Sequence, residues 1–211
     1  MQKQGGDDGD DPEAALVRAA IEGADGLRDL YRRYMPRVYA YVAYRVGSRQ
    51  DAEDVVSETF LRVAKDLRRF RYRGQGSFAA WLFRIVNNLV ADQGRKRKRA
   101  GPFVPLEAAG ELVDTAELPG DDLERQQEFE ELRALVATLP PQRQKVVLLR
   151  FFGELRNREI AKVLGLDERT VASHLSRGIQ ELHHKYMSLQ DRTEIGGGHE
   201  RMASVESHHA Y

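Results

Sequence analysis

The sequence predicts an all-α protein made of two small helical domains joined by a flexible acidic linker. Apolar residues recur at helical spacing over most of the chain, and the stretches that carry them are bounded by capping residues, prolines and glycines. No stretch shows the sustained alternation of apolar and polar residues that is typical of a strand. Residues 100–122 contain three prolines and few large apolar side chains, so they divide the chain into two units.

The N-terminal unit is expected to begin after a short head. Residues 1–11 are polar and acidic, a composition that predicts disorder. Asp11 and Pro12 form an N-cap followed by proline in the first turn, so a first helix is predicted to about Glu22. A second apolar-periodic stretch continues from there to Gly47.

A third helix is predicted from the capping pair Ser48 and Asp51 to about Leu67. On a helical wheel its large apolar residues share one arc, which marks the buried side. Three carboxylates and a leucine lie away from that arc: Asp51, Asp54, Glu58 and Leu61. An exposed leucine bordered by carboxylates is typical of a protein-docking surface, although an ordinary solvated acidic face gives the same pattern. A metal site is disfavoured, because no histidine lies nearby and no glycine-rich loop supports a calcium geometry.

A basic, aromatic loop over residues 71–76 precedes a long helix that is predicted to start at the N-cap Ser77 and to end in the cluster 95–99. Phe78 and Trp81 are expected in its buried face. The opposite face carries Arg84, Asn87, Asn88 and Arg95. Arginine and asparagine read base edges and phosphates, and such a loop can stack a base. The pattern predicts contact with nucleic acid, the alternative being a helix end that only aids solubility.

The charge of the chain is segregated although its net charge is +0. The segment from Arg62 to Arg99 has a net charge of +10, which predicts a polyanionic partner. The segment from Phe103 to Glu131 has a net charge of −9 and would repel that partner. The two segments therefore have different tasks or lie apart in space.

The second unit is expected to start near Leu123 with a helix to Ala137. A break at residues 139–141 precedes a helix to about Phe152. Residues 189–211 are polar and rich in glycine, which predicts a flexible tail.

Between them lies the pattern of a helix-turn-helix. A short helix over 157–164 is followed by a turn at Gly165, a new N-cap at Asp167 and a helix from Glu168 to about Met187. The buried face of that last helix is predicted to hold Val171, Leu175, Ile179 and Leu182. The opposite face holds Arg169, Ser173, Ser176, Arg177 and Gln180, as in a recognition helix that enters a major groove. Arg169 and Thr170 are also placed for phosphate contact, and an ordinary helical hairpin is the alternative.

Composition excludes several classes of function. The chain has no cysteine, so neither disulfides nor thiol chemistry are expected. No apolar run approaches the roughly 20 residues of a membrane span, and the acidic N-terminus is unlike a secretory signal, so a cytoplasmic protein without membrane insertion is expected. No glycine-rich loop ends in Lys-Ser or Lys-Thr, so neither nucleotide hydrolysis nor a cofactor is expected.

These residues resemble the extracytoplasmic-function sigma factors. Region two of that family is similar to Asp51-Ala-Glu-Asp-Val-Val-Ser-Glu-Thr-Phe-Leu-Arg, to Gly76-Ser-Phe-Ala-Ala-Trp-Leu-Phe-Arg-Ile, and to Asn88 with Asp92. Region four is similar to Leu139-Pro-Pro-Gln-Arg, Val147-Leu-Leu-Arg-Phe, Glu159-Ile-Ala and Thr170-Val. The resemblance covers about residues 25–187, in the order of the family.

The resemblance implies a non-enzymatic initiation factor that binds core RNA polymerase and directs promoter-specific transcription. Residues 12–99 would dock on the clamp of the largest catalytic subunit through Asp51, Asp54, Glu58 and Leu61. The same domain would bind and open the minus-ten element by trapping a flipped base, through Tyr72, Arg73, Arg84, Asn87, Asn88 and Arg95.

The resemblance assigns the second domain, residues 123–188, to the flap of the second-largest subunit and to the minus-thirty-five element. The side chains that would read this element are Arg169, Thr170, Ser173, His174, Ser176, Arg177 and Gln180. The linker over 100–122 would thread near the RNA exit path as a mimic of nucleic acid. An anti-sigma factor is implied as a further partner, and no metal is implied.

The chain departs from the family pattern in its second domain. Arg156 stands where the family usually has a capping serine, so Asn157 is expected to cap one residue late. Ala172 stands where a basic residue is frequent and His174 where arginine is usual, which predicts a weaker phosphate grip or a different sequence preference. All six histidines lie at or after His174 at irregular spacing, which favours a solvated tail over a metal sensor.

Two rival functions remain open at this level. A dimeric helix-turn-helix regulator explains residues 156–187 but leaves the basic block and the acidic face without a task; it would bind duplex DNA alone. A metal nuclease would use Asp51, Asp54 and Glu58, and would show magnesium-dependent cleavage.

Overall fold

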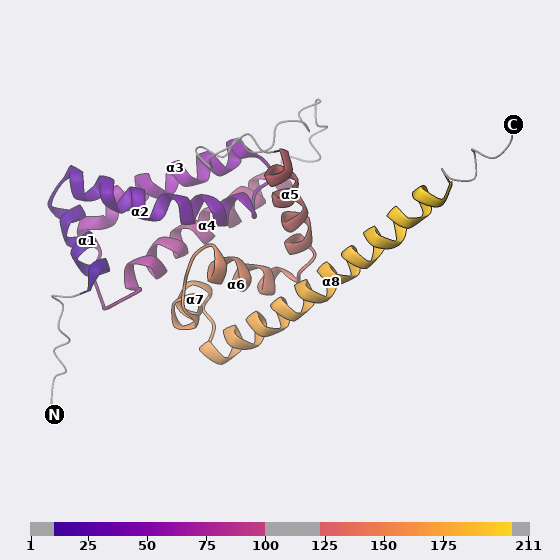
Figure 1. The fold of residues 1–211 in the computed structure, drawn as a ribbon. Helices are drawn as coiled ribbons and strands as arrows, with labels where there is room; N and C mark the ends of the chain where they lie inside the picture. The colour runs from indigo at the N-terminus through magenta and orange to yellow at the C-terminus, as the bar shows by residue number, and fades with distance from the viewer. Residues whose placement is uncertain (1–10, 100–122, 204–211) are drawn as a thin grey trace, which may run out of the picture.

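The computed structural model describes residues 11–99 and 123–203, with side chains over 11–97 and 127–188, and every regular element in this part is helical. The first module contains α1 (Pro12–Glu22), α2 (Ala24–Ala43), α3 (Arg49–Asp66), the 3-10 turn η1 (Leu67–Arg69) and α4 (Ser77–Arg99). The second contains α5 (Leu123–Ala137), α6 (Pro141–Phe151), α7 (Asn157–Leu164) and α8 (Glu168–Ala203) (Figure 1). The all-α prediction is confirmed. The predicted linker, most of the head and the last residues lie outside the described residues.

Helices α1 and α2 form a close hairpin at the start of the first module. Asp11 caps α1 by accepting a hydrogen bond from Glu13 N at 3.0 Å, as its sequence predicts. Gly26 lies against the backbone of Ala19, where a Cβ would overlap the chain, so glycine permits this close approach. The second helix then runs past Pro36 as one element.

Helix α3 has the predicted buried side. Ser48 caps it by accepting from Asp51 N at 3.1 Å. Ala52, Val55, Val56, Thr59 and Val63 are buried, and the Thr59 hydroxyl donates to Val55 O at 2.7 Å. Phe60 is only half-buried, with its ring at 4.7 Å from that of Tyr31. The helical wheel thus gave the correct core face.

The start of α4 differs from the prediction. Ser77 is the first helical residue rather than the N-cap, and its hydroxyl accepts from Arg73 N at 3.1 Å within the loop. The terminal N–H groups of Gly76 and Ala79 instead donate to Glu13 of α1. The cap thus comes from a residue distant in sequence, which no local pattern reveals. Phe78 is fully buried as expected, while Trp81 is half-buried against it.

The helix-turn-helix lies where the sequence places it, with one correction to its buried face. Gly165 ends α7 with φ of +68°, a left-handed conformation that favours glycine. Val171 is fully buried, but Ile179 is 42% exposed, so its assignment to the buried face was wrong. Gly178 occupies the buried position, and a Cβ there would lie 2.8 Å from Val147 Cγ2. Helix α6 approaches α8 too closely for a larger side chain at this point.

Helix α8 is longer than expected, since it continues to Ala203 instead of ending near Met187 (Figure 1). Glycines lower the helix propensity of residues 189–203 and led to the prediction of a tail. No proline interrupts this segment, however, and extension of an existing helix is far less costly than its nucleation.

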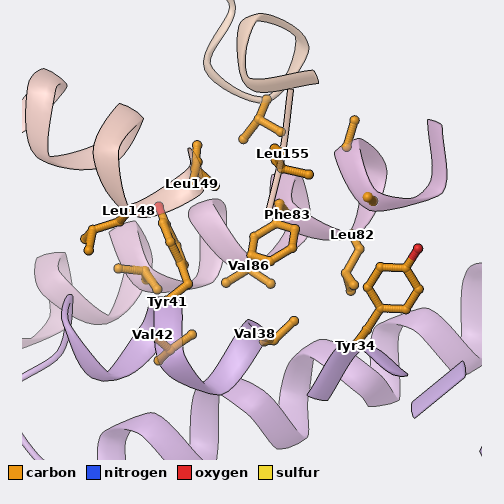
Figure 2. Close-up of a cluster of buried hydrophobic side chains, with 14 of the residues drawn as sticks. Tyr34, Val38, Tyr41, Val42, Leu82, Phe83, Val86, Leu148, Leu149 and Leu155 are labelled. Atoms are coloured by element: carbon orange, nitrogen blue, oxygen red, sulfur yellow. The ribbon is translucent and has the colours of Figure 1, made fainter. Parts of the chain in front are cut away.

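The two modules pack against each other. One continuous hydrophobic cluster contains residues of both modules. Figure 2 shows Tyr41, Phe83 and Val86 of the first module facing Leu148, Leu149 and Leu155 of the second. We call this contact, with the polar bonds around it, the inter-module seam. Tyr44 extends it, with its ring at 4.8 Å from Phe129 and 4.4 Å from Phe152.

Candidate nucleic-acid interface

The outward face of α8 is open to solvent, as the sequence predicted. Its exposed side chains are Arg169, Ser173, Ser176, Arg177 and Gln180. His174, which lies on the same helix, is half-buried. The described part of this helix therefore offers cations, hydroxyls and an amide along one side, which is the chemistry that reads base edges and phosphates.

The first turn of α8 is capped by its own N-terminal side chains. The Asp167 carboxylate accepts from Thr170 N at 2.8 Å and from the Thr170 hydroxyl at 2.7 Å. These bonds, the hydroxyl first, hold the pKa of Asp167 below its usual value. Both donors of Thr170 are thus used inside the protein, so Arg169 is the better placed of the two for a phosphate.

Helix α7 is capped without the serine that is usual in the family that the sequence resembles. Arg156 occupies the N-cap, and its backbone N–H donates to Glu159 Oε2 at 2.7 Å. The expectation that Asn157 caps one residue late was wrong, because the Glu159 carboxylate forms half of a capping box and fixes the start of the helix. The Arg156 guanidinium has no acceptor atom and instead donates to Gln75 Oε1 at 3.0 Å.

The basic face of α4 is mostly exposed. Asn88 and Arg95 lie open to solvent, with Arg95 paired to Asp92 one turn earlier. Asn87 is half-buried and accepts from the Tyr41 hydroxyl at 3.3 Å, so its amide is partly committed to the fold. Arg84 is exposed but donates to Lys162 O of α7 at 2.8 Å.

The loop before α4 places its two predicted side chains differently. Arg73 is exposed, whereas Tyr72 is half-buried with its hydroxyl donating to Asp11 and, at 3.2 Å, to Glu13. Burial, followed by these two carboxylates, raises the pKa of Tyr72 above its usual value. The hydroxyl therefore remains a protonated donor. The loop joins Tyr72 to α1, a contact that its sequence did not indicate.

The acidic face of α3 is exposed at its centre, whereas one end of it is bonded to other side chains of the protein. Asp54 is exposed, and Leu61 is 66% exposed although it is apolar. The Asp51 carboxylate accepts from Gln93 and lies 3.9 Å from Arg97 NH1, while Glu58 pairs with Arg62 at 2.6 Å. These carboxylates turn to different partners, and no group of three or more metal-ligating side chains is found among the described residues.

Polar bonds across the seam join the loop before α4 and the basic face of α4 to α7. Gln75 O accepts from Arg158 NH2 at 3.1 Å, beside the Arg156 and Arg84 bonds given above. On the other side, Arg37 donates to Gly153 O and lies 3.4 Å from Glu154 Oε2. The basic face of α4 therefore lies partly against α7 in this conformation. Sequence reasoning missed the roles of Arg37 and Glu159. Arg37 binds residues of the other module, and Glu159 caps a buried turn at the start of its own helix.

Comparison with known proteins agrees with these two modules. Residues 30–100 match the family described as Sigma-70 region 2, and residues 129–182 match Sigma-70, region 4. The chain is 30% identical over 158 residues to RNA polymerase sigma factor YlaC of Bacillus subtilis, covering 75% of this chain and 90% of that protein. It is also 36% identical over 170 residues to the ECF RNA polymerase sigma factor BldN of Streptomyces coelicolor, covering 79% and 62%. This chain is an extracytoplasmic-function member of the sigma-70 family.

Other sigma factors add to this assignment. The ECF RNA polymerase sigma factor SigE of Mycolicibacterium smegmatis is 35% identical over 161 residues, covering 73% of this chain and 59% of that protein. The alignments with BldN and SigE thus span less than two thirds of those relatives. The fold is shared with CnrH in complex with the cytosolic domain of CnrY, at a TM-score of 0.61 and 21% identity over 82% of this chain and 96% of that one.

A second solved structure has the same fold: RpoE in complex with the anti-sigma factor NepR from Bartonella quintana, at a TM-score of 0.60 and 20% identity, covering 76% and 96%. The sigma-70 regions correspond to the two structural modules, region 2 to α2–α4 and region 4 to α5–α8. None of the helices in the described residues combines the length and apolar character of a membrane span.

Arg177 provides a direct test of the sigma region 4 surface. Arg177→Ala is expected to weaken promoter binding by about 1–3 kcal/mol, because the exposed guanidinium lies on the outward face of α8. Binding of polymerase carrying this chain to a promoter fragment, measured by footprint titration, checks the effect. Arg28→Ala, which removes an exposed arginine from α2 of the other module, is the matched control. An unchanged footprint would show that Arg177 does not contact the promoter.

Proposed function

We propose that this chain binds core RNA polymerase and directs promoter-specific transcription initiation. The observation that carries the proposal is the pairing, on one chain, of a basic exposed face on α4 with an exposed polar recognition face on α8. Two separate DNA-reading surfaces fit a protein that recognises two promoter elements. A helix-turn-helix regulator needs only the second.

Residues 12–99 form the proposed unit for polymerase docking, minus-ten recognition and melting, and residues 123–188 the unit for the minus-thirty-five element. On the first unit, Asp54 and Leu61 form the exposed part of the docking surface, which faces the polymerase clamp. On the second, the outward residues of α8 face the major groove, and the same unit contacts the polymerase flap. An anti-sigma factor is a further proposed partner of this chain.

We infer that the protein acts in the cytoplasm and has no catalytic activity of its own. Polymerase and promoter DNA are both found there, and strand opening by capture of a flipped base needs binding energy rather than hydrolysis. The magnesium-nuclease alternative lacks support, since the carboxylates of α3 take different partners.

Run-off transcription tests the proposal. Core polymerase with this chain is expected to give defined transcripts from a subset of a promoter library, and core polymerase alone to give none. The chain by itself is expected to bind duplex promoters weakly. Failure to co-purify with core polymerase, or tight duplex binding without it, would favour the regulator.

The docking surface has its own test. Asp54→Lys is expected to weaken binding to core polymerase about tenfold, because it reverses an exposed charge on the face of α3 that carries Leu61. Fluorescence titration of labelled chain with core polymerase measures this. Asp29→Lys, an exposed reversal on α2, is the control and should leave the affinity unchanged. Equal losses in the two variants would move the docking surface away from α3.

A further inference from the structure

Glu13 collects hydrogen bonds from parts of the first module that are distant in sequence. Its Oε1 accepts from the Tyr34 hydroxyl at 2.8 Å and from Ala79 N at 3.1 Å. Its Oε2 accepts from Gly76 N at 2.7 Å and from the Tyr72 hydroxyl at 3.2 Å. A carboxylate bonded to several donors is a strong and geometrically specific anchor.

Two of these bonds cap α4. The first N–H groups of a helix have no partners inside it, and negative charge is favourable at that end. The hydroxyl of Ser77 accepts from Arg73 N in the loop, so Glu13 takes the place of a local cap for Gly76 and Ala79. A residue of α1 therefore fixes where α4 begins.

The other two bonds join the loop to the hydrophobic core. Tyr34 is buried, with its ring at 5.1 Å from that of Phe78. Tyr72 is held by Glu13 and also by Asp11, the N-cap of α1. Glu13 thus lies between a fixed tyrosine of α2 and the tyrosine of the loop, and the position of Tyr72 follows from that of α1.

This anchor does not depend on the inter-module seam. All four donors to Glu13 belong to the first module. Gly76 also lies against the second module, on the side opposite to its bond with Glu13. A Cβ added to Gly76 would overlap Glu159 Oε1. Separation of the modules would take Glu159 away from the loop, whereas Glu13 would remain beside it.

We propose that Glu13, supported by Asp11, is a positioning residue for minus-ten recognition. It sets the conformation of the loop before α4, and so the place at which Tyr72 and the first turns of α4 meet DNA. The inference rests on the proposed function, because it assigns a task within the proposed minus-ten surface.

A double-mutant cycle tests the coupling between Glu13 and Tyr72. Holoenzyme is formed from core polymerase and each of Glu13→Gln, Tyr72→Phe and the double variant, and is titrated with a fluorescent single-stranded oligonucleotide that carries the minus-ten sequence of a run-off promoter. Each single variant is expected to bind about tenfold more weakly, and the double variant no more weakly than either. Glu22→Gln, exposed at the other end of α1, is the control and should bind as the wild type does. A loss of about 100-fold in the double variant would overturn the proposal, as would wild-type binding by Glu13→Gln.

Amide exchange of the free chain provides a second readout that needs neither DNA nor polymerase. Glu13→Gln is expected to speed exchange of the Gly76 and Ala79 amides about tenfold or more, and Glu22→Gln to leave it unchanged. Unchanged exchange in Glu13→Gln would show that Glu13 does not hold the loop. If the wild-type chain failed to bind core polymerase, the proposed function and the recognition role would fall together, while faster exchange would still establish the anchor itself.

Discussion

Phe83→Ala is expected to lower the free energy of unfolding by about 3–5 kcal/mol. The Phe83 side chain is 0% exposed and packs edge-on against Tyr41, with ring centroids 5.7 Å apart. Figure 2 places its ring between Val86 and Leu155, where the two modules meet. The surrounding side chains come from several helices and cannot all collapse into the space. Urea denaturation followed by far-ultraviolet circular dichroism measures the loss.

Phe151 supplies a matched control for this prediction. Its side chain is 58% exposed at the end of α6, so Phe151→Ala should change the free energy of unfolding by no more than about 0.5 kcal/mol. A loss below about 1 kcal/mol for Phe83→Ala, or equal losses in the two variants, would contradict the position of Phe83 at the centre of the shared core.

Arg37→Ala is expected to raise about 10- to 100-fold the ratio of chains whose modules have separated (open) to chains in which the inter-module seam is formed (closed). Arg37 donates across the seam to Gly153 O and pairs with Glu154 at 3.4 Å. A hydrogen bond from a charged group contributes about 1.5–3 kcal/mol, which corresponds to this change in ratio. The stacking of Arg37 on Tyr34 and Phe83 lies within the first module, so it persists on opening and does not affect the ratio.

Energy transfer between dyes on the two modules measures the opening of Arg37→Ala. Arg33→Ala removes an exposed arginine from the preceding turn of α2 and is expected to leave the transfer efficiency unchanged. Opening also breaks the bond from Arg84 to Lys162 O and so frees its guanidinium, and Arg37→Ala should therefore bind promoter DNA more tightly than the wild type in the absence of polymerase. Unaltered energy transfer would mean that the apolar contacts alone hold the seam.

The sequence predicted the helices well because their signals are local. The apolar arc of α3 and the turn at Gly165 depend on residues a few positions apart, and both are found in the structure. Of the predicted buried face of α8, Val171 is fully buried, Leu175 and Leu182 are partly buried, and Ile179 is exposed. Spacing favoured Ile179 as buried, but the close approach of Val147 leaves room only for Gly178, and that approach is a tertiary property.

The candidate site was predicted only as far as single helix faces allow. The exposure of Arg177 and Leu61 follows from helical periodicity. The partners of Tyr72 and Arg84 do not, because they lie on α1 and α7, and only the assembled fold brings them near. Glu13 was missed for the same reason: in the sequence it is an ordinary acidic residue in the first turn of a helix.

The apolar character of the seam makes the state of the free chain depend on temperature. Separation of the modules exposes Tyr41, Leu148 and Leu149 to water, and such exposure carries a positive change in heat capacity. The hydrophobic contribution to closure therefore weakens on cooling. Polar bonds such as that of Arg37 lack this dependence, so they carry a larger share of closure in a cold cell. Temperature is thus expected to change how many free chains leave the proposed DNA-reading face of α4 uncovered by α7.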